Sequence, residues 1–121
     1  MPSLVNIKGP DMGACYPIGD AHLISVGRDE KCDIQIRDVR VSRQHLQLTN
    51  ENGAHTVADY RTANGTLLNG ADVTEKTPLK DGDQIRIGDT TLVYTTDDYP
   101  DAATAVTEAK KKGEWKRSTI M

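Results

Sequence analysis

Two arginines, a serine and a histidine fall within six positions of the segment VRVSRQH, residues 39–45. These side chains could do three kinds of chemistry. Ser42 and His45 could form a nucleophile and its base. The cations could be part of a nucleic-acid surface. The arginines and the hydroxyl could instead hold a single phosphate group, because a guanidinium matches phosphate oxygens two at a time.

The Ser–His pair lacks the surroundings of a hydrolase. Asp59 could complete a triad, but no G-x-S-x-G turn surrounds Ser42. If residues 42–45 begin a strand, Ser42 and His45 point to opposite faces. The sequence therefore favours His45 as a buried imidazole that bonds backbone groups near a tight turn.

Charge is distributed unevenly along the 121 residues. Residues 1–100 carry 10 Lys and Arg against 15 Asp and Glu, whereas residues 101–121 carry 5 against 3. Five of the six arginines in the first hundred residues lie between positions 28 and 61. This pattern argues against an extended nucleic-acid surface and suits a small anion site on an acidic body.

The remaining titratable residues indicate neither a metal site nor a disulfide scaffold. Cys15 and Cys32 form no C-x-x-C pair, and we expect two reduced, half-buried thiols. His22, His45 and His55 have no metal-ligand spacing. No apolar run reaches membrane-spanning length, so we expect a cytoplasmic protein with no metal, no cofactor and no membrane partner.

Short segments of alternating polarity predict a β-rich fold. Seven segments are predicted as strands: 4–7, 22–26, 32–36, 45–49, 55–60, 84–87 and 90–95. Turn signals such as Asn-Gly separate them, which favours an antiparallel sandwich. Residues 99–113 predict a short helix, with Pro100 and Asp101 in its first turn and Gly113 as its end. We expect residues 97–121 to form a loosely held helix or a flexible tail.

Three predicted loops could supply an anion site: Gly27-Arg28, Ser42-Arg43 and residues 62–65. Together, GR (27–28), SRQH (42–45), DYRTANGT (59–66) and NG (69–70) resemble the signature of the forkhead-associated (FHA) domain. The resemblance covers about residues 4–96. It implies an FHA/SMAD-type antiparallel β-sandwich of about eleven strands over residues 1–96. It also implies a non-enzymatic module that binds phosphothreonine peptides.

The resemblance implies a phosphopeptide site built from these loops. Arg28 would contact the phosphate, Ser42 would donate its hydroxyl, and Arg43 would be a second phosphate ligand. Asn64 would hold the backbone of the peptide, and Thr62 would bond within the loop that shapes the pocket.

Other residues would support that site. Ala63 stands where some members have a threonine, so one side-chain contact is lost. Gly27 would allow a close turn, His45 would brace the loops, and Gly65 would take a positive φ angle. Asn69 would order the neighbouring loop and could touch the backbone of the ligand.

Two further hypotheses concern selectivity and the tail. Arg40 stands where some members read an acidic residue three positions after the phosphothreonine; the alternative is a solvated loop arginine. A phosphorylated tail could also make an intramolecular contact with the pocket. The threonines concerned are at positions 95, 96, 104, 107 and 119. Asp98 lies three residues after Thr95, which is the spacing that the Arg40 hypothesis requires.

The sequence therefore predicts a phosphothreonine-dependent recognition module in Ser/Thr kinase signalling. Its partner would be a phosphothreonine-containing protein, such as a kinase or a kinase substrate. The alternative is a forkhead-associated scaffold that binds partners through its surface independently of phosphate. A nucleic-acid partner and a hydrolase are the less favoured readings.

Overall fold

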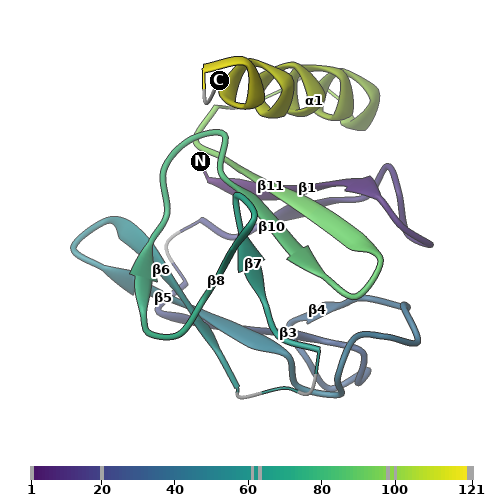
Figure 1. Cartoon of the computed structure of the whole chain (residues 1–121), viewed down its shortest axis with the longest axis vertical. Coiled ribbons are helices and arrows are strands. Elements are labelled where there is room, and N and C mark those ends of the chain that lie inside the picture. Colours follow the sequence, from purple (N-terminus) through teal and green to yellow (C-terminus); the bar gives the residue numbers. More distant parts are fainter. Residues whose placement is uncertain are drawn as a thin grey trace.

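The computed structural model describes residues 2–19, 21–60, 62, 64–97, 99 and 101–119, with side chains up to residue 112. Two β-sheets lie face to face, and one helix covers the outside of the larger sheet (Figure 1). The six-stranded sheet has the order β2 (Cys15–Pro17), β1 (Ser3–Lys8), β11 (Thr90–Thr95), β10 (Gln84–Ile87), β7 (Leu67–Leu68) and β8 (Ala71–Asp72). The five-stranded sheet has the order β4 (Ile34–Gln35), β3 (Leu23–Gly27), β5 (Leu46–Glu51), β6 (Ala54–Asp59) and β9 (Thr77–Pro78).

Alternation along each strand builds the core between the sheets. Leu46 and Leu48 of β5 are fully buried, whereas Gln47 between them is only partly covered, because successive side chains point to opposite faces. The other sheet contributes Ile85 and Leu92 to the same aliphatic cluster. The sandwich expected from the sequence is therefore confirmed.

The predicted strands and the observed strands differ in number for a physical reason. All seven predicted segments contain strands, but β2, β7, β8 and β9 were not predicted. Each is only two or three residues long, which is too short to show a period of two. Asn69 and Gly70, with φ angles of 51° and 88°, form the tight turn between β7 and β8.

One pairing departs from the antiparallel expectation. β3 and β4 pair in parallel, with Val26 opposite Ile34 and Gly27 opposite Gln35. Residues 28–33 form the loop that connects these two strands. This places β4 at the edge of the five-stranded sheet, beside the loops that carry the arginines.

The C-terminal helix α1 (Ala102–Thr119) continues through residue 113, so the expected end at Gly113 is wrong. Asp101 precedes the helix and caps it: its carboxylate accepts the Thr104 N–H at 2.7 Å. Pro100 lies outside the described residues. No helix in the described part of the chain is long and apolar enough to cross a membrane.

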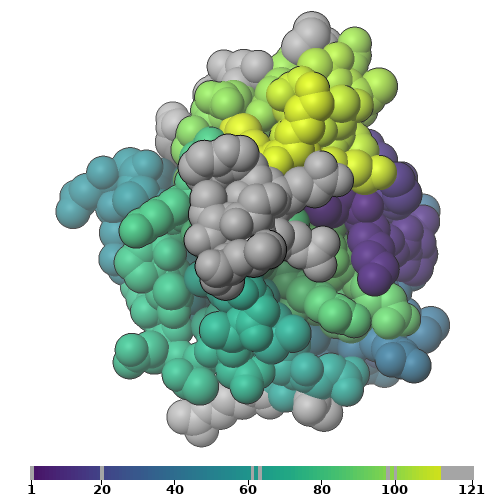
Figure 2. Space-filling model, turned by 45° about the horizontal axis from the view of Figure 1, so that its top comes forward, coloured from purple at the N-terminus to yellow at the C-terminus, as the bar shows by residue number. Residues whose placement is uncertain are grey.

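Helix α1 packs on the outer face of the six-stranded sheet. Ala105 and Ala109 lie against Val5 of β1 and Val93 of β11, and all four are buried. The small alanine side chains let the helix approach the sheet closely. Figure 2 shows the helix, in yellow-green, directly against the purple N-terminal strand.

The two cysteines lie in different environments. Cys15 is exposed on β2, and Cys32 is buried with its thiol 3.2 Å from the carbonyl oxygen of Arg43. The sequence had suggested two half-buried thiols, and this expectation is wrong for both. Burial chiefly raises the pKa of Cys32, with the nearby Asp29 carboxylate adding to the rise, so this thiol is a poor nucleophile at neutral pH.

Candidate functional site

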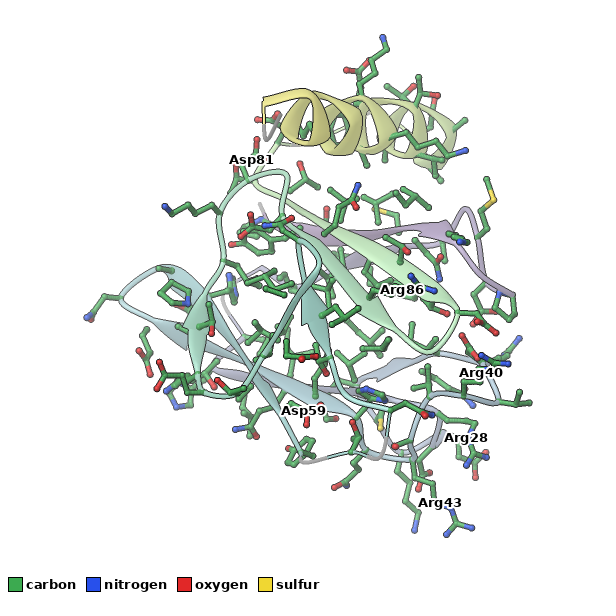
Figure 3. The ribbon with its side chains drawn as sticks, viewed as in Figure 1. Arg28, Arg40, Arg43, Asp59, Asp81 and Arg86 are labelled. Atoms are coloured by element: carbon green, nitrogen blue, oxygen red, sulfur yellow. The ribbon has the colours of Figure 1, made fainter. Side chains whose placement is uncertain are left out.

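Three loops meet at the end of the sandwich that lies away from α1. They are residues 28–33 after β3, residues 36–45 before β5, and the segment between β6 and β7. Figure 3 shows Arg28, Arg40 and Arg43 together at this end, opposite the helix. The fold therefore brings together three of the five clustered arginines.

Backbone hydrogen bonds hold the first two loops against each other. The N–H of Arg28 donates to the Ser42 carbonyl at 3.0 Å, and the N–H of Asp29 donates to the Arg43 carbonyl at 3.1 Å. Gly27 permits this contact, because a Cβ atom there would lie 2.1 Å from the Arg43 carbonyl oxygen. The glycine is thus explained by close approach of two backbones rather than by a turn.

The Arg28 side chain is oriented by the neighbouring loop. Its Nε donates to the Val41 carbonyl at 2.9 Å, which leaves the two terminal nitrogens of the guanidinium available to an anion. A cavity of about 340 Å³ is lined by Arg28, Asp29, Glu30, Gln35 and Arg43. Two guanidinium groups therefore share one surface cavity, next to two carboxylates.

Ser42 lies between these arginines in the chain and is partly buried. Its N–H donates to Nδ1 of His45 at 3.0 Å. Among the described residues its hydroxyl has no hydrogen-bond partner, so it can donate to a ligand. A nucleophilic serine needs a base that accepts its hydroxyl proton. Nδ1 of His45 is not free for this role, because it already accepts the Ser42 N–H.

His45 is fully buried and joins two loops. Because Nδ1 accepts from Ser42, the ring proton belongs on Nε2, which lies 2.7 Å from the Gly65 carbonyl oxygen and donates to it. The Thr62 hydroxyl also lies 3.2 Å from Nε2. The His45 ring therefore joins the loop of Ser42 to the loop of Gly65.

Asp59 organises the third loop from the end of β6 (Figure 3). Its carboxylate accepts the Thr62 N–H and hydroxyl, both at 3.0 Å, and the Thr66 hydroxyl at 2.7 Å. The Thr62 hydroxyl extends this hydrogen-bond network, because its oxygen accepts the Gly65 N–H at 3.1 Å. Gly65 has a φ angle of 70°. The sequence had placed Asp59 only in a triad, so its role in shaping the loop was missed.

Asn64 connects the third loop to the second. Its Nδ2 donates to the Arg40 carbonyl at 2.9 Å, and the residue is exposed next to the arginines. The Arg40 side chain is about two-thirds exposed, with Nε 3.6 Å from Asp89. Ala63 and Arg61 lie outside the described residues.

Asn69 lies on a different connection. Its Nδ2 donates to Asp83 at 2.9 Å, and its Oδ1 accepts the Gln84 N–H at 2.9 Å. Both polar atoms of the side chain are therefore engaged in joining the β7–β8 turn to β10. This arrangement explains an ordering role and leaves the side chain little capacity for a ligand.

Asp38 supports the second loop and was missed in the sequence. It is buried, and its carboxylate accepts the Arg40 N–H at 2.9 Å and both the Asp89 N–H and the Thr90 hydroxyl at 2.8 Å. Burial by itself would raise the pKa of Asp38, but these hydrogen bonds hold it below its ordinary value. Two of its three partners, Asp89 and Thr90, lie about fifty positions away, so no local pattern marks the residue.

The described residues contain no group of three or more His, Cys, Asp or Glu side chains that could hold a metal ion. Of the other histidines, His22 is exposed, and His55 is buried with Nδ1 2.9 Å from the Tyr94 hydroxyl. The chemistry that the arrangement offers is anion binding by Arg28, Arg43 and a serine hydroxyl.

Comparisons with known proteins agree with this geometry. The family model for the FHA domain matches residues 24–88. The glycogen accumulation regulator GarA of Mycobacterium tuberculosis is 37% identical over 93 residues, which cover 77% of this chain and 56% of GarA. The chain therefore spans about half the length of that relative.

Two solved structures extend the comparison. A chain from a structural and functional study of phosphothreonine-dependent FHA domain interactions matches with a TM-score of 0.70 and 26% identity, covering 81% of this chain and 98% of that one. Mycobacterium tuberculosis EmbR, solved with a low-affinity phosphopeptide, matches with a TM-score of 0.73 and 26% identity, covering 81% of this chain and 25% of EmbR.

Proposed function

We propose that this chain, which belongs to the FHA domain family, recognises phosphothreonine in a partner protein and catalyses no reaction. One observation carries the proposal: Arg28 and Arg43 line the same cavity, on loops locked together by backbone hydrogen bonds. Preorganised charged donors bind an anion without the entropic cost of ordering flexible loops. Similar FHA domains studied for phosphothreonine-dependent interactions support the choice of ligand.

The proposed roles follow from the contacts of each residue. Arg28 contacts the phosphate with its terminal nitrogens while its Nε stays on Val41. Ser42 donates its hydroxyl to a phosphate oxygen, and Arg43 supplies the second guanidinium. Asn64 holds the backbone of the ligand with its carboxamide oxygen, since Nδ2 is bonded to Arg40.

The cellular setting is part of the same proposal. We place the chain in the cytoplasm, in Ser/Thr kinase signalling, with a kinase or a kinase substrate as its phosphorylated partner. The description of GarA as a regulator is consistent with a protein that acts by binding.

Titration with matched peptides tests the function. A phosphothreonine peptide selected from a library should bind, and its unphosphorylated twin should not. We expect Arg28→Ala and Ser42→Ala to remove measurable binding while the fold survives. Each charge-assisted hydrogen bond contributes about 1.5–3 kcal/mol, so the loss of Arg28 weakens binding about tenfold or more.

Arg86→Ala is the matched control, because Arg86 is an exposed arginine on β10 outside the three loops (Figure 3). It should bind as the parent does. Equal binding of the two peptides would instead identify a scaffold that acts independently of phosphate. Parent-like binding by both Arg28→Ala and Ser42→Ala would show that the site is wrongly placed.

We further propose that Arg40 selects an acidic residue three positions after the phosphothreonine. Its guanidinium is largely exposed at the rim of the site, with Nε 3.6 Å from the exposed Asp89. A phosphopeptide array should show enrichment of Asp or Glu at this position, and Arg40→Ala should abolish the enrichment. A preference for Leu or Ile that Arg40→Ala leaves unchanged would contradict the assignment.

A further inference from the structure

A second groove lies beside the phosphate cavity, between the free edges of the two sheets. Its volume is about 480 Å³. One wall comes from the β1–β2 hairpin, with Met12, Ala14 and Tyr16, and the other comes from β4, with Ile34 and Gln35. β2 and β4 are each the last strand of a sheet, and residues of both line this groove.

The β4 edge is open to another chain at only one position. Ile36 donates its N–H to Gly27 of β3 at 2.8 Å, so the backbone groups of its neighbour Gln35 face away from β3, towards the groove. On either side of it, the Asp33 N–H is bonded to the Ser25 hydroxyl at 2.9 Å and the Arg37 N–H to the Asp11 carboxylate at 2.8 Å. The edge is thus closed at both ends and open at Gln35.

The groove is lined by polar and charged residues, including the exposed Arg37, and by an apolar set in which Met12 offers a contact to an apolar residue. Met12 is 54% exposed and is one of the few large apolar side chains at the surface of the described residues. The two carboxylates in the lining are already engaged, Asp11 with the backbone of Arg37 and Asp33 with Ser25. An aliphatic side chain can therefore pack against Met12 without leaving either carboxylate unpaired.

The groove and the phosphate cavity adjoin at Gln35, which lines both. Its side chain reaches towards the phosphate loop, where Nε2 lies 3.3 Å from the Arg28 carbonyl oxygen. Arg40 and Asn64, which are assigned to the peptide beyond the phosphate, do not line the groove. A chain held at the phosphate can therefore reach the groove past Gln35 without displacing Arg40 or Asn64.

We propose that this groove binds a second segment of the same phosphothreonine ligand, in extended form. One residue of that segment pairs with the backbone of Gln35, and a Met- or Leu-sized side chain packs against Met12. Adding a strand to an exposed sheet edge is a common way to bind a peptide, and the alternate side chains of the added strand provide selectivity. The inference rests on the proposed function and extends it from a phosphate site to a longer ligand.

The test compares long and short ligands. A library with phosphothreonine at the centre of fifteen residues should select Met, Leu or Ile at one position of one flank. The selected peptide should bind about tenfold more tightly than the same peptide truncated before that residue, as measured by calorimetry. Met12→Glu should remove this gain and leave the affinity of the truncated peptide unchanged.

Leu23→Glu is the matched control, since Leu23 is 53% exposed and lies outside the groove. It should retain the gain. Backbone pairing is tested on the ligand: N-methylation of one amide near the selected residue should abolish the gain, whereas N-methylation of the adjacent amides should not.

The outcomes separate this inference from the proposed function. If the truncated phosphopeptide binds but no flanking residue is selected, the groove is not a ligand site and the function stands. If Met12→Glu keeps the gain, or lowers the affinity of the truncated peptide equally, the groove assignment is wrong. If no phosphothreonine peptide binds at all, both proposals fail.

Discussion

At the scale of single residues, the candidate site depends on side chains that touch no ligand. His45 uses both ring nitrogens on backbone groups of two different loops. Removing the ring would leave the partly buried Ser42 N–H without its partner, and an unpaired donor costs up to about 1–3 kcal/mol when it is fully buried. This buried residue thus fixes the Ser42-Arg43 loop to the loop of Gly65, and backbone hydrogen bonds hold Arg28 beside it.

Asp38 has the same supporting role on the opposite side of the second loop. Its carboxylate accepts three donors, and an asparagine amide would offer only one oxygen to them. We expect Asp38→Asn to lower the free energy of unfolding by about 2 kcal/mol or more at pH 6. It should also weaken phosphopeptide binding, because residues 38–41 lead directly into Ser42.

The pKa of Asp38 makes this effect depend on pH. The pKa is lower in the folded state than the ordinary value of about 3.9, so the contribution to stability is present above that value. It is lost as the pH falls through the folded pKa. Urea unfolding should therefore show the difference between the parent and Asp38→Asn shrinking from pH 5 to pH 3.

Asp89→Asn is the control for this pH series, because Asp89 is a neighbouring carboxylate that is 56% exposed. It should unfold with nearly the same free energy as the parent. A difference between the parent and Asp38→Asn that stays constant down to pH 3 would contradict the role given to the buried carboxylate.

At the scale of elements, α1 is attached by a small apolar contact and one polar cluster. The Lys112 ammonium lies 2.8 Å from both Asp81 and Asp97, donates to the Thr95 hydroxyl at 2.9 Å and lies over the Tyr99 ring. Burial alone would lower the pKa of Lys112, but the two carboxylates hold it above its ordinary value. The helix is therefore joined to the body of the protein near its middle.

Replacing Lys112 tests this attachment. Because Asp81 and Asp97 remain 42% and 62% exposed, we expect Lys112→Met to cost only about 1 kcal/mol. Hydrogen exchange in α1 should become faster, because the helix opens more often. Lys111→Met is the control, since Lys111 is 66% exposed and pairs with Glu108 of the same helix. Equal exchange in the two variants would show that Lys112 does not hold the helix.

The position of α1 also bears on the threonines of the tail. Thr95 is fully buried, with its hydroxyl engaged by Lys112, so a kinase could reach it only after local opening. Thr107 is exposed on the helix, and its hydroxyl donates to the Ala103 carbonyl. Asp98 lies outside the described residues. An intramolecular contact of a phosphorylated tail stays a prediction, and it would require α1 to leave the sheet.

At the scale of the whole molecule, the candidate site and the helix occupy opposite ends of one sandwich (Figure 3). Among the described residues, no hydrogen bond joins the three loops to α1. Residues 1–100 are acidic overall, so attraction of a phosphate is confined to the arginines and is not a property of the body. Stability contributed by α1 and affinity for the ligand should therefore vary independently.

Ala109→Arg tests that independence. Ala109 is fully buried against the sheet, so a large charged side chain cannot be accommodated without displacing the helix. We expect the free energy of unfolding to fall by about 1–3 kcal/mol while the affinity for a phosphothreonine peptide stays within about twofold of the parent. Chemical denaturation and calorimetry on the same sample measure the two quantities.

Thr107→Arg places the same side chain on an exposed position of the same helix. This control should change neither stability nor affinity appreciably. A parallel loss of affinity in Ala109→Arg would show that α1 and the loops are coupled through the sandwich.

Secondary structure could be predicted from the sequence wherever a pattern repeats or involves residues that are close together in the chain. The alternation of Leu46 and Leu48 with polar neighbours predicted β5, and the Asn-Gly turns were marked by residue type. The grouping of Gly27-Arg28 with Ser42-Arg43 predicted where the cationic loops meet. The two-residue strands β7, β8 and β9 were not predictable, because each is too short to show a pattern of its own. β7 and β9 are held by pairing with β10 and β6, and β8 by pairing with β7.

The sequence by itself determined the sandwich, the family resemblance and the residues that could meet a phosphate. Only the tertiary structure decided which groups support those residues, namely Asp38 with Asp89 and Thr90, and Asp59 with Thr62 and Thr66. It also decided where a sheet edge stays open, at Gln35. Hydrophobic alternation and turn chemistry act over a few residues and leave a local trace. Buried hydrogen bonds and the free edges of sheets join segments far apart in the chain, so they exist only once the sheets have packed.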